Sequence, residues 1–222
     1  MVLVAARNEA DRIGATVDAL SAAFPGGRIV VADDGSDDGT SDLALAHGAE
    51  VVSRRRPHGK GGSMTAAAAT VEPLSEVGGS PTFLLCDGDL GASARELRRL
   101  ADAVEGGECD LAIAAFARRL GGGFGIALRF ARWTVRSRCG YRAQAALSGQ
   151  RAMRAEVLRA VFPFAPGYGM EIGITIDAVR SGYAVGEIEL DLEHRATGRN
   201  LAGFAHRARQ LFDFARVWWA RR

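Results

Sequence analysis

The sequence contains few cysteines and no long run of apolar residues. Its three cysteines, Cys86, Cys109 and Cys139, are widely spaced and form no Cys-x-x-Cys pair, so neither structural zinc nor a disulfide framework is expected. No stretch approaches the roughly 20 apolar residues that a membrane-spanning helix requires. The apolar run Val2–Ala6 is also too short for a signal peptide. These absences predict a cytoplasmic protein, or a peripheral one at the cytoplasmic face of the membrane.

Several nucleotide and hydrolase motifs are missing as well. Gly59-Lys60 resembles part of a P-loop, but the first glycine of that motif would fall at Arg54, and no Ser or Thr follows Lys60. The glycines of 121–125 do not form Gly-x-Gly-x-x-Gly between a strand and a helix. The sequence has neither the Gly-x-Ser-x-Gly of serine hydrolases nor the His-Glu-x-x-His of zinc peptidases. P-loop, dinucleotide-binding and these hydrolase classes are therefore excluded.

Composition and charge fit one globular domain with two functional halves. The 222 residues are 48% hydrophobic and 24% charged, with a net charge of +2. Residues 1–110 hold 10 basic and 18 acidic residues, whereas residues 111–222 hold 18 and 8. Arginine supplies 27 of the 28 basic residues, a bias to which we attach no functional meaning. The split predicts two roles, with a cation held by the first half (1–115) and anions held by the second half (116–222).

The spacing of apolar residues predicts alternating strands and helices in the first half. The expected strands are Val2–Ala6, Arg28–Ala32, Glu50–Ser53, Thr82–Cys86 and Asp110–Phe116. Helices are expected between them, one of them opened by a capping box of Ser93 and Glu96. Such alternation with short connections predicts an α/β fold, a mostly parallel sheet with helices on both faces. A helix over Gly169–Arg180 and a strand over Tyr183–Leu192 are expected in the second half.

Acidic residues follow two of the expected strands. Asp33-Asp34 comes after the second strand, and Asp87-Gly88-Asp89 comes after the strand that ends at Cys86. Ligands of such sheets bind at the carboxyl ends of the strands, and grouped carboxylates suit Mg²⁺ or Mn²⁺ held together with substrate phosphates. The alternative for residues 33–38 is a turn with a helix cap, because Asp, Gly and Ser are turn formers.

Four motifs in this order give the sequence a specific resemblance. They are Val4–Glu9 (VAARNE), Val30–Thr40 (VVADDGSDDGT), His58–Gly62 (HGKGG) and Leu84–Leu90 (LLCDGDL). The sequence resembles family-2 glycosyltransferases with the GT-A fold, over nearly its whole length. Two later segments, residues 147–152 and 167–171, are similar to acceptor-side segments of the polyprenyl-phosphate branch of that family.

The resemblance implies a donor site in the first half. Its expected residues are Ala5, Arg7, Glu9, Asp33, Asp34, Lys60, Asp87, Gly88 and Asp89. Asp33 or Asp34 would accept a hydrogen bond from the base, and Lys60 would lie near the phosphates. Asp87 and Asp89 would hold the ribose and the Mg²⁺ or Mn²⁺. The family usually has Pro and an aromatic residue where this chain has Ala and Arg before Asn-Glu, which weakens the implied base contacts.

The resemblance also implies acceptor-side residues. Glu171 is the candidate general base, and the alternative is a favourable partner for a helix dipole. The segment from His194 to Arg199 would form a loop over the diphosphate, with His194 as a third metal ligand and Arg195 and Arg199 near the phosphates. The alternative there is a solvated turn.

The basic half contains aromatic residues among its arginines. Residues 116–159 hold 10 Arg and one acid, and Phe130 and Trp133 lie between Arg129 and Arg136. This pattern suits an anionic lipid surface, or else the aromatics pack inside the domain. The tail predicts an amphipathic helix with its apolar face at Leu201, Phe204, Ala208, Leu211, Ala215 and Trp218. Core packing or a homodimer is favoured for this helix over membrane contact. Nucleic acid is not expected as a partner.

The expected activity is metal-dependent transfer of a sugar from a UDP- or GDP-hexose, with inversion implied by the resemblance. The favoured acceptor is a polyprenyl phosphate, which is already anionic; a hydroxyl acceptor would need a general base. The alternatives are a small soluble acceptor and a non-catalytic nucleotide-sugar-binding scaffold. A sugar-1-phosphate nucleotidyltransferase would require a glycine-rich first loop, which residues 4–8 lack.

Overall fold

A seven-stranded sheet forms the centre of the molecule, with strand order β3-β2-β1-β4-β6-β5-β7. The computed structural model describes residues 1–222 except 55, 72–80, 117–124 and 193–200, and it describes the side chains of the last helix from residue 209 onward. The strands are β1 (Val2–Ala6), β2 (Ile29–Asp33), β3 (Glu50–Ser53), β4 (Thr82–Asp87), β5 (Leu111–Phe116), β6 (Arg151–Arg154) and β7 (Val185–Leu190). The sheet confirms the predicted α/β fold.

Most strands are parallel, and β6 is the exception. This strand runs antiparallel to both of its neighbours, pairing Ala152 with Leu84 of β4 and with Ala112 of β5. The sequence did not predict β6, because its four residues, RAMR, are too short to show alternation. Since the neighbouring strands end at the edge where β6 begins, residues 148–150 arrive at the carboxyl edge of the sheet.

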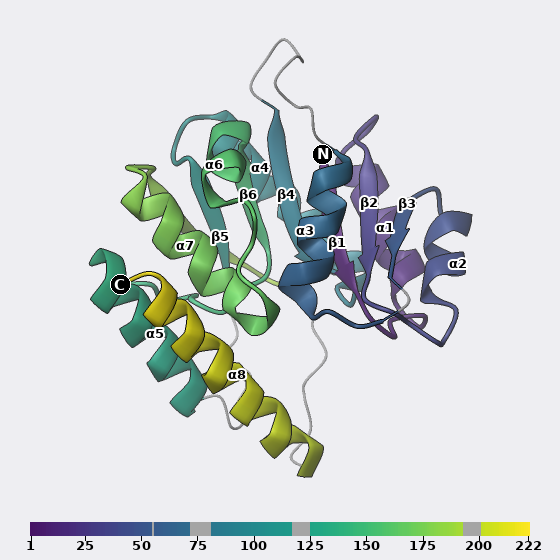
Figure 1. The fold of residues 1–222 in the computed structure, drawn as a ribbon. Coiled ribbons are helices and arrows are strands. Elements are labelled where there is room, and N and C mark those ends of the chain that lie inside the picture. The colour runs from purple at the N-terminus through teal and green to yellow at the C-terminus, as the bar shows by residue number, and fades with distance from the viewer. Residues whose placement is uncertain (55, 72–80, 117–124, 193–200) are drawn as a thin grey trace.

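Helices cover both faces of the sheet (Figure 1). The helices are α1 (Ile13–Ala23), α2 (Thr40–Ala46), α3 (Lys60–Thr70), α4 (Arg98–Glu105), α5 (Gly125–Cys139), α6 (Ala155–Val161), α7 (Met170–Arg180) and α8 (Leu201–Ala220). Val17 of α1 and Leu100 of α4 belong to the apolar cluster on one face. Met64 of α3 and Ile174 of α7 belong to the cluster on the other.

The helices α5 and α8 form a third layer outside the sheet, where they pack on α7. Their shared cluster includes Ala131 and Val135 of α5, Ile176 of α7, and Phe214 and Val217 of α8. Figure 1 shows α5 and α8 lying side by side beyond α7. Within the described residues, no helix combines the length and the apolar character needed to cross a membrane.

The tail helix is confirmed, but its predicted apolar face is displaced. Phe214 and Val217 are fully buried, whereas the predicted face residue Ala215 is exposed and Trp218 is only partly buried. The buried positions of α8 are 210, 214 and 217, so its buried side lies about one position from the expected one, although the predicted face residue Leu211 also packs against the shared cluster. The side chains of the predicted positions 201, 204 and 208 lie outside the described part of the helix.

The predicted capping box is wrong. The Ser93 hydroxyl donates to the carbonyl of Leu90 at 2.7 Å, and residues 91–97 form a 3-10 helix before α4 begins at Arg98. Thr16 of α1 holds this segment, because its hydroxyl accepts from Gly91 N and donates to Gly88 O, both at 2.8 Å. A tertiary contact therefore replaces the local cap.

Candidate active site

A pocket of about 490 Å³ lies at the carboxyl edge of the sheet. The ends of β1, β2 and β4 form its floor, and the start of α3, residues 166–168 and α8 form its walls. Eight of the expected donor-site residues line it: Ala5, Arg7, Glu9, Asp34, Lys60, Asp87, Gly88 and Asp89. The carboxyl edge is where ligands of doubly wound sheets bind. The position of the pocket and the residues that line it therefore both agree with the expected donor site.

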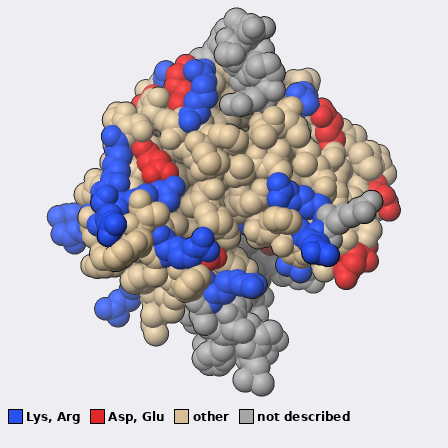
Figure 2. All heavy atoms as spheres, in the orientation of Figure 1, with Lys and Arg blue, Asp and Glu red and all other residues tan. Residues whose placement is uncertain are grey.

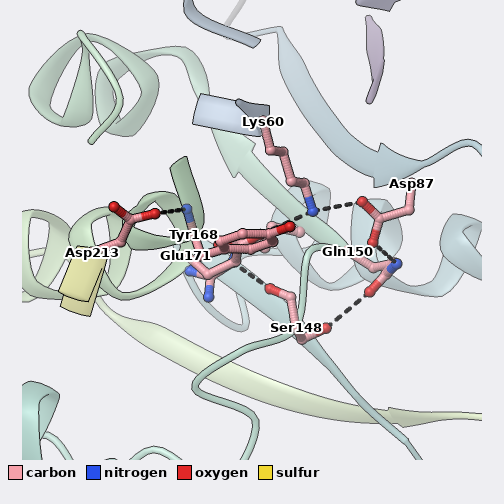
Figure 3. Close-up of polar contacts among 8 residues, drawn as sticks. Lys60, Asp87, Ser148, Gln150, Tyr168, Glu171 and Asp213 are labelled. Carbon is pink, nitrogen blue, oxygen red and sulfur yellow. Dashed lines mark hydrogen bonds and ion pairs between the residues drawn. The ribbon is translucent and has the colours of Figure 1, made fainter. Parts of the chain in front are cut away.

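Lys60 joins two carboxylates at the back of this pocket (Figure 3). It is the first residue of α3, and its Nζ lies 2.5 Å from Asp87 Oδ1 and 2.9 Å from Glu171 Oε1. Burial alone would lower the pKa of Lys60, but the charges of Asp87 and Glu171 outweigh burial and raise it above the usual lysine value. Lys60 is therefore a permanent ammonium group between the donor-side and acceptor-side carboxylates.

The segment before β6 completes the contacts of Asp87. Gln150 Nε2 donates to Asp87 Oδ2 at 2.8 Å, and the Ser148 hydroxyl donates to Gln150 Oε1 at 3.1 Å. A Cβ at Gly149 would lie 2.6 Å from Asp87 Oδ2 and would also collide with Lys60 Nζ, so this close packing requires glycine. The sequence pointed to residues 147–152 through the resemblance alone, and the structure places them against the donor-side carboxylate.

Asp87 and Asp89 both line the pocket, and both residues are partly exposed. Both carboxylate oxygens of Asp87 bind protein groups. An aspartate oxygen beside a phosphate-sized space fits Mg²⁺ or Mn²⁺, which take hard oxygen ligands. Among the described residues, no group of three His, Cys, Asp or Glu side chains could hold a metal alone. A cation held there would take its other ligands from nucleotide oxygens, from water or from further residues. The predicted ligand His194 lies outside the described residues, as do Arg195 and Arg199.

Asp33 is the last residue of β2 and Asp34 follows it, and their side chains bind different segments. The Asp33 carboxylate accepts from Ser36 N at 2.9 Å and from the hydroxyls of Ser36 and Ser41, and it does not line the pocket. The Asp34 carboxylate accepts from His58 N at 2.7 Å, Gly59 N at 2.9 Å and the Ser63 hydroxyl at 2.5 Å. Asp33 thus stabilises its own turn, and Asp34 fixes the loop that presents Lys60.

The loop after β1 is braced against the loop after β2. Asn8 adopts a left-handed φ of 56°, its N–H donates to the Ser36 hydroxyl at 2.9 Å, and its Oδ1 accepts from Asp37 N at 3.1 Å. Glu9 N donates to the Thr40 hydroxyl at 2.9 Å. These contacts place exposed Arg7 at the pocket opening.

Helix α8 adds residues that were not predicted for the site. Arg209, Asp213 and Arg216 line the pocket with Tyr168, and Tyr168 N donates to Asp213 Oδ2 at 3.0 Å. Their spacing of four and three residues puts the three side chains on one face of α8, a polar pattern that the sequence displayed. What the sequence could not show is that this face turns to the ends of β1 and β4.

Glu171 lies behind Lys60, outside the pocket lining. Beneath it, Arg151 of β6 is fully buried, with Nη1 donating to the Thr175 hydroxyl at 2.8 Å and Nε donating to Ser148 O at 2.9 Å. Burial lowers the pKa of Arg151 to about 10, against the opposing effect of Glu171. The candidate base is therefore paired with Lys60, is influenced by the charge of Arg151 and does not line the described pocket.

A mostly parallel sheet covered by helices, with a pocket lined by carboxylates at its carboxyl edge, is an α/β fold of the GT-A type. The sequence profile described as "Glycosyl transferase family 2" matches residues 1–162. The chain belongs to glycosyltransferase family 2 and is a glycosyltransferase, as the sequence predicted.

Similar proteins include two curated relatives. The chain is 32% identical to a glucosyl-3-phosphoglycerate synthase of Mycolicibacterium paratuberculosis, covering 95% of this chain and 69% of the relative. It is 27% identical to an undecaprenyl-phosphate mannosyltransferase of Micrococcus luteus, covering 90% of this chain and 86% of the relative.

A solved structure gives the same fold. It is glucosyl-3-phosphoglycerate synthase from Mycobacterium tuberculosis in complex with Mn²⁺, UDP and phosphoglyceric acid. The superposition covers 98% of this chain and 77% of the synthase chain, with a TM-score of 0.75 and 26% sequence identity. The same synthase is also known with Mg²⁺ and UDP, at 27% identity and a TM-score of 0.76 over 98% of this chain and 78% of its own.

Proposed function

We propose that this enzyme transfers a hexose, with inversion, from a UDP-sugar to an acceptor that carries a phosphate group, with Mg²⁺ or Mn²⁺ as cofactor. One observation carries the proposal: a single pocket joins the carboxylates at the end of β4 to two arginines of α8, Arg209 and Arg216. Both curated relatives are named after a compound that carries a phosphate group. UDP is favoured over GDP because structures of the tuberculosis synthase hold UDP.

The positions of the described side chains support the following donor site. Asp89 would hold the cation, and Asp87, fixed by Lys60 and Gln150, would bind the ribose side of the nucleotide. A divalent cation bound there would neutralise the departing diphosphate as a Lewis acid. Arg7 at the opening and Arg216 on α8 add positive charge around the same space.

The reaction breaks the bond between the anomeric carbon and the diphosphate oxygen, whose electron pair leaves with UDP. An acceptor oxygen forms the new bond to that carbon from the opposite side, which inverts it. A phosphate oxygen brings no proton to this step, whereas a hydroxyl must lose one. Because Glu171 is paired with Lys60 and does not line the pocket, whereas Asp213 does, Asp213 is the carboxylate that would take a hydroxyl proton.

The two candidate acceptors, a polyprenyl phosphate and a small phosphorylated acid, differ in whether they need Asp213 as a base. A polyprenyl phosphate attacks through its own anionic oxygen, so Asp213→Asn should leave most of the rate. A small acid such as phosphoglycerate attacks through a hydroxyl, so Asp213→Asn should lower kcat by about a hundredfold or more. Turnover of UDP-hexose with undecaprenyl phosphate in detergent and with 3-phosphoglycerate, each with wild type and Asp213→Asn, separates these acceptors.

The donor site is tested by calorimetric titration of UDP and GDP, each with and without Mn²⁺. We expect UDP to bind only with Mn²⁺, and Asp89→Ala to weaken binding at least about tenfold, as loss of one charged ligand does. Asp102→Ala is the matched control, since Asp102 lies on α4 and pairs with Arg98. Absence of UDP binding by folded wild type would overturn the donor assignment. Binding without transfer to either phosphate acceptor would overturn the acceptor assignment and favour a nucleotide-sugar-binding scaffold.

A further inference from the structure

The outer side of the α5–α8 layer exposes four large apolar side chains. Ile126 is 77% and Trp133 50% exposed on α5, and Phe212 is 62% and Trp219 60% exposed on α8. The members of each pair are seven residues apart, so each pair lies along one side of its helix. That side is opposite the buried residues, such as Val135 and Phe214, through which the layer packs on α7. Together they form an outward apolar strip that the described fold leaves uncovered.

Aromatic stacking holds this strip in place. The rings of Phe130 and Trp133 stack with centroids 5.5 Å apart, and Trp133 stacks on Trp218 of α8 at 5.6 Å. The Arg138 guanidinium lies 3.9 Å from the Trp218 ring centre, a favourable cation–π contact. Since these contacts join the two helices, the strip is formed before any partner binds.

The charges that accompany the strip are of one sign. Its exposed arginines are Arg129 and Arg136 on α5, and Arg216 and Arg222 at α8. The sequence of α5 contains no acidic residue and that of α8 contains one, Asp213, which lies on the pocket side and accepts from Tyr168 N. In Figure 2, basic side chains predominate over the part of the molecule where α5, α7 and α8 lie.

We infer that this surface docks on an anionic lipid bilayer. We call it the α5–α8 face and define it by Ile126, Arg129, Trp133, Arg136, Phe212, Arg216, Trp219 and Arg222. Helices that lie on a membrane combine an apolar strip with flanking arginines, which bind lipid headgroups while the apolar side chains enter the boundary with the acyl chains. Tryptophan is favoured at that boundary, because its ring is apolar and its N–H is polar.

A second copy of the chain fits this face poorly. In a twofold dimer the same patch meets itself, so Arg129, Arg136 and Arg222 of the two copies would approach one another. The face has no carboxylate to pair with them, and like charges in an interface disfavour association. A lipid surface supplies the missing negative charge.

The face adjoins the active site. Arg216 belongs to the face and also lines the pocket, so docking would place the pocket opening at the level of the lipid headgroups. The inference goes beyond the proposed function and does not depend on it, because its ligand is bulk lipid, with or without a lipid acceptor.

Tryptophan fluorescence measures docking of this face directly. All three tryptophans, Trp133, Trp218 and Trp219, lie on α5 or α8, so tryptophan fluorescence comes from this layer alone. We expect vesicles of phosphatidylcholine with phosphatidylglycerol to bind the protein, to shift its emission to the blue, and to quench it when the acyl chains are brominated. Phosphatidylcholine vesicles should bind weakly, and added salt should weaken binding to the anionic ones.

The decisive variant is Ile126→Glu with Phe212→Glu, which changes two highly exposed side chains outside the pocket lining. It should lower partitioning to the anionic vesicles about tenfold or more. The control Leu45→Glu, at a 55% exposed position on α2, should bind as wild type does. Circular dichroism verifies that each variant is folded.

Three outcomes would overturn the inference: no binding of wild type to anionic vesicles, equal binding by the double variant, or a wild-type dimer that the double variant dissociates. Preferential binding to an oligonucleotide at the same salt concentration would reassign the face to nucleic acid. Asp89→Ala should bind vesicles normally, so failure of the donor site and failure of docking are distinguishable.

Discussion

At the scale of single residues, the site is organised around one cation. Lys60 contacts Asp87 and Glu171, and Gln150 donates a further hydrogen bond to Asp87. The sequence indicated Lys60 through its Gly-Lys-Gly context and Asp87 through its place after an apolar strand. It gave no sign that Lys60 lies between Asp87 and the candidate base, because that depends on how α3 and α7 approach each other.

We predict that Lys60→Met lowers the free energy of unfolding by about 3 kcal/mol at pH 7, because it leaves two partly buried carboxylates without their cation. Urea unfolding at pH 7 measures this difference in free energy.

Arg98→Met is the control for this prediction, since its pairs with Asp102 and Glu105 are largely exposed and such pairs contribute little. A Lys60→Met variant as stable as wild type at pH 7 would show that the two carboxylates do not depend on this ammonium group.

At the scale of elements, the boundaries of the strands could be predicted from the sequence better than the packing of the helices. Every predicted strand is present within one to two residues, because buried parallel strands form continuous apolar runs. The short reversed strand β6 and the orientation of α8 were not predictable. Both depend on contacts between segments far apart in the chain, such as Ala152 with Leu84 and Phe214 with the α7 layer.

The loop before α3 provides a test at this scale. Asp34→Asn should lower the free energy of unfolding by about 2 kcal/mol, because an amide replaces a carboxylate that accepts from two backbone N–H groups and the Ser63 hydroxyl. It should also weaken nucleotide binding, since the loop presents Lys60. Chemical denaturation and calorimetry measure the two quantities.

Asp37→Asn is the matched control, because Asp37 is exposed and lies outside the pocket lining. If Asp34→Asn weakened binding with unchanged stability, the role of Asp34 would be the direct base contact implied by the resemblance. The sequence could not choose between the two, since both place an aspartate at the end of β2.

At the scale of the whole molecule, two apolar clusters include the sheet and a third joins α5 and α8 to α7. Family membership and fold were predictable from four motifs in order. The third layer was not, because the sequence favours core packing or a homodimer for the tail helix and does not show which of its apolar residues are buried. In the structure Phe214 and Val217 are buried, while Phe212 and Trp219 are exposed.

This arrangement predicts how amide hydrogen exchange is distributed. Amides of α8 should exchange faster than those of β1 and β4, because α8 packs on other helices and not on the sheet. UDP with Mn²⁺ should slow exchange in α8, since Arg209, Asp213 and Arg216 line the pocket, and should leave α2 unchanged. Protection confined to the loops after β1 and β4 would instead mean that α8 takes no part in binding.

The arginine bias of the sequence has a consequence for chemical modification. Acylation removes the charge of lysine side chains, and this chain has a single lysine. Lys60 is paired with two carboxylates that raise its pKa, so it remains protonated and is a poor nucleophile toward acyl donors. The surface charge of the α5–α8 face consists of guanidinium groups, which keep their charge throughout the physiological pH range. Neither lysine acylation nor a change of pH within that range would remove the positive charge of this face.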